Sequence, residues 1–172
     1  MNTAILKVVD AIRECNLHIE RLSSAVRDLK TIFPLDNNKY DSLTEIDIRT
    51  LDQFIFRYSK LQDAMGERLF PSVLMILEEN IAKMPFLDKL NRLEQLQLIE
   101  SKDTWLYLRK LRNEFSHEYS NSTDENISAM NRLFDKLPDI YNIFMNIKNY
   151  LFEKFEEEFK QYNNELDTTR LF

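Results

Sequence analysis

The chain of 172 residues contains a single glycine, Gly66. A protein of this length has about twelve on average. The turns of β-sandwiches, phosphate-binding loops and dinucleotide-binding folds need glycine where the backbone is left-handed or approaches a ligand closely. Those folds are therefore excluded. Hydrophobic residues at 44% and charged residues at 30% then favour an all-α globular protein.

Apolar residues recur every three or four positions, which is the spacing of one face of an α-helix. This stripe predicts a first helix from Ile5 to Phe33, which Pro34 ends. A polar loop is expected over 36–42. A second helix starts near Thr44 or Asp47, where a side-chain cap is available, and runs to Leu77. We expect a kink in its second half, at Gly66 and Pro71.

The second half of the chain predicts three more helices. A short one covers 86–96, a fourth begins after the cap residue Ser101 and reaches Phe115, and a last one covers 127–162 with a bend at Pro138. Residues 163–172 are expected to fray. The order predicts one domain over 1–172, a four- to five-helix up-and-down bundle with long first and last helices. We assign most of each apolar stripe to an intramolecular core, and a dimer interface is the alternative.

Charge and cysteine content narrow the function. The net charge of −6 argues against a general nucleic-acid coat protein, although a local basic site remains compatible with it. The lone Cys15 excludes an internal disulfide and a Cys-based zinc site. No apolar run reaches the roughly 18 residues of a membrane span, and the first ten residues lack a signal-peptide pattern. We therefore expect a cytoplasmic protein that does not bind membranes.

The two histidines differ in their surroundings. His18 lies beside the first apolar stripe with no metal-ligand spacing around it, so we interpret it as an ordinary boundary residue. His117 follows a basic cluster in an otherwise acidic chain. If the helix is regular, one face carries Arg109, Asn113 and His117, and another carries Arg112, Ser116 and Tyr119.

Arginine and histidine together suit the cleavage of RNA. A guanidinium binds phosphate oxygens and stays charged, while an imidazole moves a proton near neutral pH. They could promote attack by a ribose 2′-hydroxyl on its own phosphodiester without a metal or cofactor. A solvated helix is the alternative interpretation. Arg112 and His117 stand about 140° apart on an ideal helix. Their convergence therefore requires either a helix end near Ser116 or a second copy of the chain.

At these residues the sequence resembles the HEPN superfamily, and more closely its HepT-like toxin branch. The family signature is an arginine, four to six residues, a histidine, any residue and a tyrosine, often with a polar residue after the arginine. The chain matches it with Arg112, Asn113, His117 and Tyr119. The segments 105–111 and 56–66 also resemble the family's lead-in to the motif and its second helix.

The resemblance implies a homodimeric, metal-independent endoribonuclease toxin in which Arg112, Asn113 and His117 are catalytic. It also implies an MNT-type nucleotidyltransferase antitoxin that transfers AMP to Tyr119. RNA is then the substrate, and DNA is not expected. From context, Arg109 and Arg57 are further candidate contacts to RNA or phosphate, with surface ion pairs as the alternative.

The sequence is also compatible with two other functions. One is a non-catalytic companion that presents substrate to a nucleotidyltransferase, and the other is a helical interaction protein with an inert motif. The four glutamates within 153–158 would suit RNA binding only if they lie away from the cleft.

Overall fold

The protein is described by a computed structural model that covers residues 2–77, 81–115, 123–162 and 166. This part of the chain is built from helices and contains no strand, which confirms the all-α prediction. The α-helices are α1 (Asn2–Leu29), α2 (Asn37–Asp41), α3 (Glu45–Ala64), α4 (Phe70–Ile76), α5 (Phe86–Gln95), α6 (Lys102–Glu114), α7 (Thr123–Asp135), α8 (Leu137–Lys154) and α9 (Glu156–Phe159). A π-helical turn, Met65–Leu69, joins α3 to α4, and a 3₁₀ turn, Lys160–Tyr162, follows α9.

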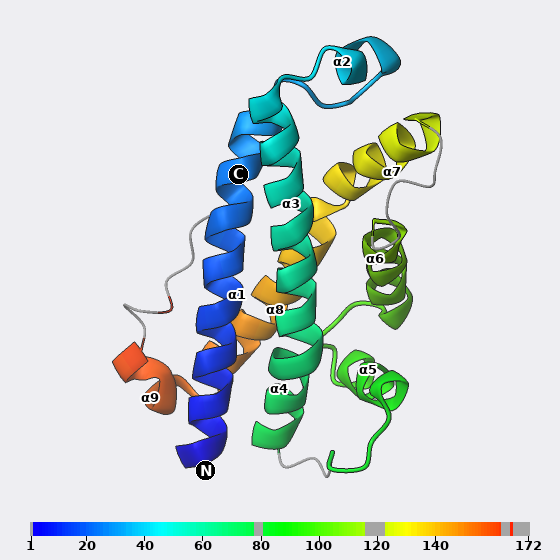
Figure 1. Ribbon diagram of the computed structural model, residues 1–172. Helices are drawn as coiled ribbons and strands as arrows, with labels where there is room; N and C mark the ends of the chain where they lie inside the picture. Colours follow the sequence, from blue (N-terminus) through cyan, green and yellow to red (C-terminus); the bar gives the residue numbers. More distant parts are fainter. Residues whose placement is uncertain (1, 78–80, 116–122, 163–165, 167–172) are drawn as a thin grey trace.

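The long helices α1 and α3 form the centre of the molecule. They lie side by side and run in opposite directions, and α4 continues the line of α3 (Figure 1). The first apolar stripe is buried as predicted, with Ile12, Ile19 and Leu22 fully inaccessible. From α3, Phe54, Tyr58 and Leu61 are equally buried, and they belong to the same core. None of the described helices is long and apolar enough to cross a membrane.

Local side-chain chemistry explains where the first helices begin and end. Helix α1 ends at Leu29, four residues earlier than expected. The loop expected over 36–42 contains the short helix α2, because the Asp36 carboxylate accepts the Lys39 backbone N–H at 2.8 Å and caps it. Helix α3 begins after Thr44, which is one of the two predicted starts. Thr44 and Asp47 cap it through a full capping box.

At Gly66, where the sequence predicts a kink, the structure has the π-helical turn, and the helix continues through it into α4. Pro71 occupies the first turn of α4, where its missing N–H costs little.

The prediction of one long last helix is wrong. Residues 127–162 are divided into α7, α8 and α9, with breaks at Lys136 and Phe155. Pro138 falls in the first turn of α8, so it starts a helix instead of bending one. The second long element is the α3–α4 helix, because the π-helical turn keeps it continuous past Gly66.

Aromatic and amide contacts hold α7 against the central pair. The rings of Phe33 and Phe134 stack with centroids 4.0 Å apart, and both lie near Phe54 of α3. The Asn131 amide pairs with the backbone N–H and C=O of Leu35 at 2.7 and 2.8 Å. These contacts fix the segment after α1 onto α7.

The shortage of glycine has a visible consequence at the end of α5. Gln97 adopts a φ of 58°, in the left-handed region where a helix usually ends on glycine. The N–H of Leu98 donates to the Leu93 carbonyl and that of Gln97 to the Glu94 carbonyl, both at 2.9 Å. This is the hydrogen-bond pattern of a Schellman motif.

Replacement of this residue by glycine should stabilise the protein. We expect Gln97→Gly to raise the free energy of unfolding by about 0.5–1 kcal/mol, because relief of the left-handed strain exceeds the added entropy of the unfolded chain. The matched control Gln95→Gly, at the last helical residue of α5, should lower it by up to about 1 kcal/mol. Urea unfolding of the two variants checks this, and an equal loss in both would contradict the assignment of strain to Gln97.

Candidate functional site

Helix α6 carries the described half of the Arg112–Tyr119 motif. Ser101 caps its start by accepting the Asp103 N–H at 3.1 Å. Lys102 joins the same end to α5, donating from its backbone N–H to Glu94 at 3.1 Å and from Nζ to Asn91 at 2.7 Å. At the other end, Glu114 binds Arg132 of α7 at 2.7 Å. The helix is therefore held at both ends against its neighbours.

The place where α6 ends bears on the geometry of the motif. The helix stops at Glu114, and Phe115 forms its C-cap with φ −94° and ψ −6°. The sequence indicates that Arg112 and His117 can converge only if the helix ends near Ser116 or if a second copy of the chain contributes one of them. The described part of the chain satisfies the first of these conditions. Ser116, His117 and Tyr119 fall within 116–122 and lie outside the described residues.

Arg112 is held by an ion pair and has one donor without a hydrogen-bond partner among the described residues. Its Nη2 lies 3.4 Å from the Asp63 carboxylate of α3, longer than a strong charge-assisted hydrogen bond. Its side chain is 22% exposed, and its buried Nε has no hydrogen-bond partner among the described residues. Asn113, the next residue, is exposed on α6. Asp63 of α3 thus orients the guanidinium, and Nε is a donor that no described residue uses.

A pocket of about 340 Å³ opens beside Arg112. Its walls come from α3 and the π-helical turn on one side and from α5 and α6 on the other, and they include Gln62, Asp63, Gly66, Phe86, Arg109 and Arg112. Arg109 places its guanidinium 5.3 Å from the centre of the Phe86 ring. The structure therefore brings two of the predicted residues, Arg109 and Arg112, to one concave surface.

The contribution of α3 to this pocket was not predicted from the sequence. Gln62 follows Tyr58 by four residues, so it lies on the apolar face of the helix, and it is 2% exposed. A polar residue on a buried stripe was the signal that could have identified it. Asp63 gave no such signal, because its pairing with Arg112 depends on how α3 and α6 pack.

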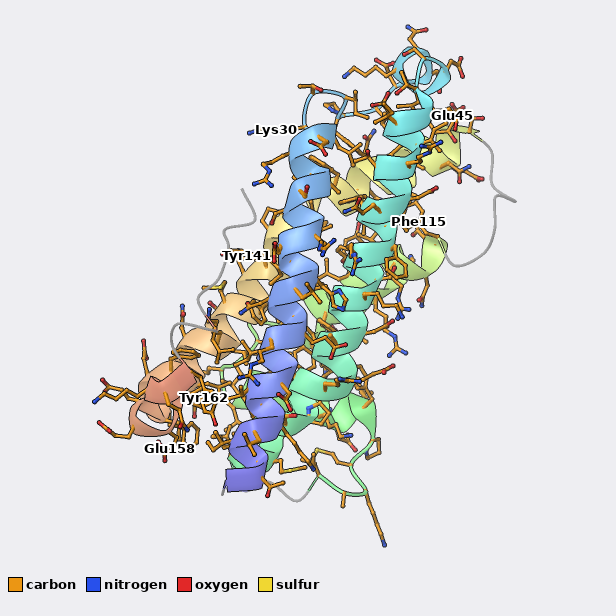
Figure 2. All side chains as sticks on the ribbon, turned by 60° about the vertical axis from the view of Figure 1, so that its left-hand side comes forward. Lys30, Glu45, Phe115, Tyr141, Glu158 and Tyr162 are labelled. Carbon is orange, nitrogen blue, oxygen red and sulfur yellow. The ribbon has the colours of Figure 1, made fainter. Side chains whose placement is uncertain are left out.

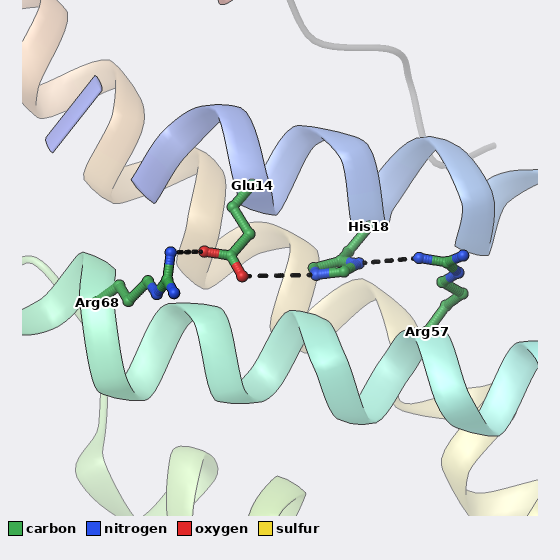
Figure 3. Close-up of polar contacts among 4 residues, drawn as sticks. All are labelled: Glu14, His18, Arg57 and Arg68. Atoms are coloured by element: carbon green, nitrogen blue, oxygen red, sulfur yellow. Dashed lines mark hydrogen bonds and ion pairs between the residues drawn. The ribbon is translucent and has the colours of Figure 1, made fainter. Parts of the chain in front are cut away.

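Arg57 lies apart from the pocket. It faces α1, where its Nη1 is 3.4 Å from Nδ1 of His18 (Figure 3). His18 Nε2 lies 3.9 Å from Glu14, and Glu14 binds Arg68 at 2.9 Å. The four side chains form a polar row between α1 and the α3–α4 helix. His18 is accordingly a buried interface residue, 8% exposed.

The surroundings of His18 favour its neutral form. Burial and the nearby Arg57 lower the pKa of His18 below its ordinary value of 6.5, with a smaller contribution from Lys60, while Glu14 and Asp63 oppose the shift. Among the described residues, no group of three histidine, cysteine or acidic side chains could hold a metal ion.

The acidic segment near the end of the chain lies away from the pocket. Helix α9 is on the opposite side of the α1–α3 pair from α6 (Figure 1). Figure 2 shows the same separation, with Glu158 and Phe115 on opposite sides of the central helices. The condition that the sequence set for RNA binding, an acidic segment distant from the cleft, is met for α9.

No protein-family model matches the chain, and neither a curated protein nor a solved structure is significantly similar to it. Membership of the HEPN superfamily therefore remains a prediction that rests on the motif at 112–119 and on the order of the helices.

The pKa shift of His18 should make stability depend on pH. His18 binds its proton at a lower pH in the folded protein than in the unfolded chain. The free energy of unfolding should therefore keep its full value above about pH 6.5 and decrease as the pH drops through and below that value. The variant His18→Gln should lose less stability between about pH 7.5 and 5.5. Urea unfolding across this range checks the prediction. The second histidine, His117, is present in both proteins, so its own titration cancels. Parallel pH profiles would contradict the expected role of His18.

Proposed function

We propose that the protein is a metal-independent endoribonuclease of the HEPN type. The observation that carries this proposal is the environment of Arg112. Its side chain is partly buried, pairs with Asp63, and has an Nε that no described residue binds. It lies at the wall of a pocket that Arg109 also lines. A preorganised guanidinium in a concave, partly dehydrated site suits a phosphate whose charge increases in the transition state.

The reaction is an internal transesterification. The 2′-oxygen of a ribose attacks the adjacent phosphorus, and the bond from phosphorus to the 5′-oxygen of the next nucleotide breaks. His117 accepts the 2′-hydroxyl proton as general base, and in its protonated form donates to the leaving 5′-oxygen. Arg112 stabilises the developing charge on the phosphate oxygens, and Asn113 orients the site. The products are a 2′,3′-cyclic phosphate and a 5′-hydroxyl.

A homodimer is part of the proposal. An apolar groove of about 660 Å³ lies next to the end of α6, and Ile48, Phe56 and Phe115 are among its lining residues. Phe56 is 52% exposed and Ile48 is 42% exposed. Exposed apolar surface of this kind is typical of a protein interface. Burial of this groove by a second copy would bring two motifs together.

Substitutions in the motif test the nuclease activity. His117→Ala should lower RNA cleavage by about 10²–10⁴-fold, through loss of proton transfer. Arg112→Lys should lower it by about 10–10²-fold, because lysine cannot bind phosphate through two parallel hydrogen bonds. Cleavage is measured on a labelled RNA in excess EDTA, with analysis of the product ends.

Arg13→Lys is the matched control, since Arg13 pairs with Asp10 on α1 and should leave cleavage unchanged. Equal cleavage by the wild type and His117→Ala would show a contaminating nuclease. If the wild-type protein cleaves no RNA under these conditions, the non-catalytic companion or the helical interaction protein becomes the better interpretation.

The proposed partner is an MNT-type nucleotidyltransferase that neutralises the nuclease by attaching AMP to Tyr119. A bulky anionic group close to Arg112 and His117 would compete for the cation and obstruct the cleft. After co-expression with an active partner and ATP, intact mass should rise by one AMP per chain. Tyr119→Phe should abolish the gain, whereas Tyr107→Phe, an exposed tyrosine of α6, should retain it. An unchanged mass with an active enzyme would contradict this regulation.

A further inference from the structure

The interface between α3 and α6 contains buried polar atoms that have no hydrogen-bond partner among the described residues. Gln62 is 2% exposed, and neither its amide nitrogen nor its amide oxygen has a hydrogen-bond partner within the described chain. The same holds for Nε1 of Trp105, which is 1% exposed, and for Nε of Arg112. Buried polar atoms are almost always paired in native proteins, so unpaired ones call for an explanation.

All three of these side chains line the 340 Å³ pocket. A leucine in place of Gln62 would fill similar volume without an unpaired amide, so folding alone does not account for glutamine at this position. A ligand in the pocket would account for it, because the amide can donate one hydrogen bond and accept another.

The backbone next to the pocket is also irregular. The π-helical turn Met65–Leu69 forms part of the wall through Gly66 and Glu67. Such turns occur often at functional sites. A Cβ atom on Gly66 would lie 3.3 Å from Cζ2 of Trp105 and 3.7 Å from the Phe86 ring. The only glycine of the chain therefore stands where a side chain would be in tight contact with Trp105 and in ordinary contact with Phe86.

The remaining lining groups indicate the chemistry of the ligand. Lys89, Arg109 and Arg112 supply three cations against the two carboxylates Asp63 and Glu67, which favours an anion such as phosphate. Phe86 and Trp105 supply aromatic surface of the kind on which nucleobases stack. An amide that both donates and accepts matches the edge of a base, as glutamine does with adenine. The volume lies at the small end of the range for ligand sites, roughly 300–1,000 Å³.

We propose that this pocket binds one nucleoside monophosphate unit, with its phosphate at Arg109 and Arg112 and the edge of its base at Gln62. The unit is either a free nucleotide or one residue of an RNA strand. In the second case the inference rests on the proposed nuclease function, and Gln62 becomes the residue that selects the base beside the scissile phosphate.

The single tryptophan of the chain, Trp105, provides the readout, because a base in the pocket changes its fluorescence. The full-length protein is titrated with the four 5′-nucleoside monophosphates, with the corresponding nucleosides, and with short 2′-O-methyl RNA oligonucleotides, which lack the attacking hydroxyl. We expect a saturable change with the monophosphates and a preference for one base. Binding of the oligonucleotide about tenfold tighter than of the mononucleotide would assign the site to an RNA strand, and equal or weaker binding would assign it to a free nucleotide.

Two variants separate base recognition from phosphate recognition. Gln62→Leu should weaken binding of the preferred nucleotide about tenfold or more and reduce the base preference, while its unfolding midpoint stays equal or rises. The matched control Gln53→Leu changes an exposed glutamine of the same helix, whose amide donates to the Arg21 carbonyl, and should bind as the wild type does. Arg109→Gln should weaken binding of nucleotides but not of nucleosides.

The inference is overturned if no nucleotide or oligonucleotide gives a saturable signal, or if Gln62→Leu and Arg109→Gln both bind like the wild type. Should Gln62→Leu fail to fold, the comparison of nucleotide with nucleoside in Arg109→Gln decides the matter. The titration does not depend on catalysis. Binding without cleavage would therefore reject only the proposed nuclease, and cleavage that needs His117 without binding in the pocket would reject only this inference.

Discussion

The rest of the structure depends on the buried contact between α1 and the α3–α4 helix, because α3 packs against both α1 and α6. One face of α3 closes the core with Phe54, Leu61 and the apolar stripe of α1. The same helix meets α6 through Gln62 and Asp63, and the π-helical turn that follows it adds Gly66 to the shared pocket. Any shift of α3 against α1 would move the carboxylate that holds Arg112. The position of the candidate site is therefore set by the packing of the longest helices, although its motif lies on a shorter one.

The scarcity of glycine shapes both the fold and the chemistry. With no glycine-rich loop to surround a phosphate with backbone N–H groups, anion binding must come from side chains that project from helices. The pocket between α3, α5 and α6 is built in this way, with arginines and a lysine on helical positions. Where other proteins use glycine to end a helix, this chain accepts a strained Gln97. Its one glycine stands instead where a side chain would press on Trp105.

Much of the fold could be predicted from hydrophobic spacing and caps. The stripe of α1, a capped start of α3 at Thr44, the limits of α5 and the start of α6 after Ser101 all follow from local sequence, and the structure confirms them. The errors arose where local signals were ambiguous. Pro138 fits the first turn of a helix as well as a bend, and the apolar stripe continues through the breaks at Lys136 and Phe155. For the site, a basic motif in an acidic chain pointed to Arg109 and Arg112, and the structure places both at one pocket. Arg57, a candidate RNA contact inferred from context, lies apart from that pocket beside His18.

The sequence by itself determined that the protein is helical, where its main helices start, and which short segment concentrates basic side chains around a histidine. These properties depend on residues close together in the chain, so spacing and capping reveal them. Only the tertiary structure decided that Asp63 pairs with Arg112, that Gln62 is buried with no hydrogen-bond partner in the described part of the chain, and that Gly66 faces two aromatic rings of other helices. Each of these relations joins residues far apart in the sequence. They depend on the rotation and depth at which α3 packs against α5 and α6, which no local pattern encodes.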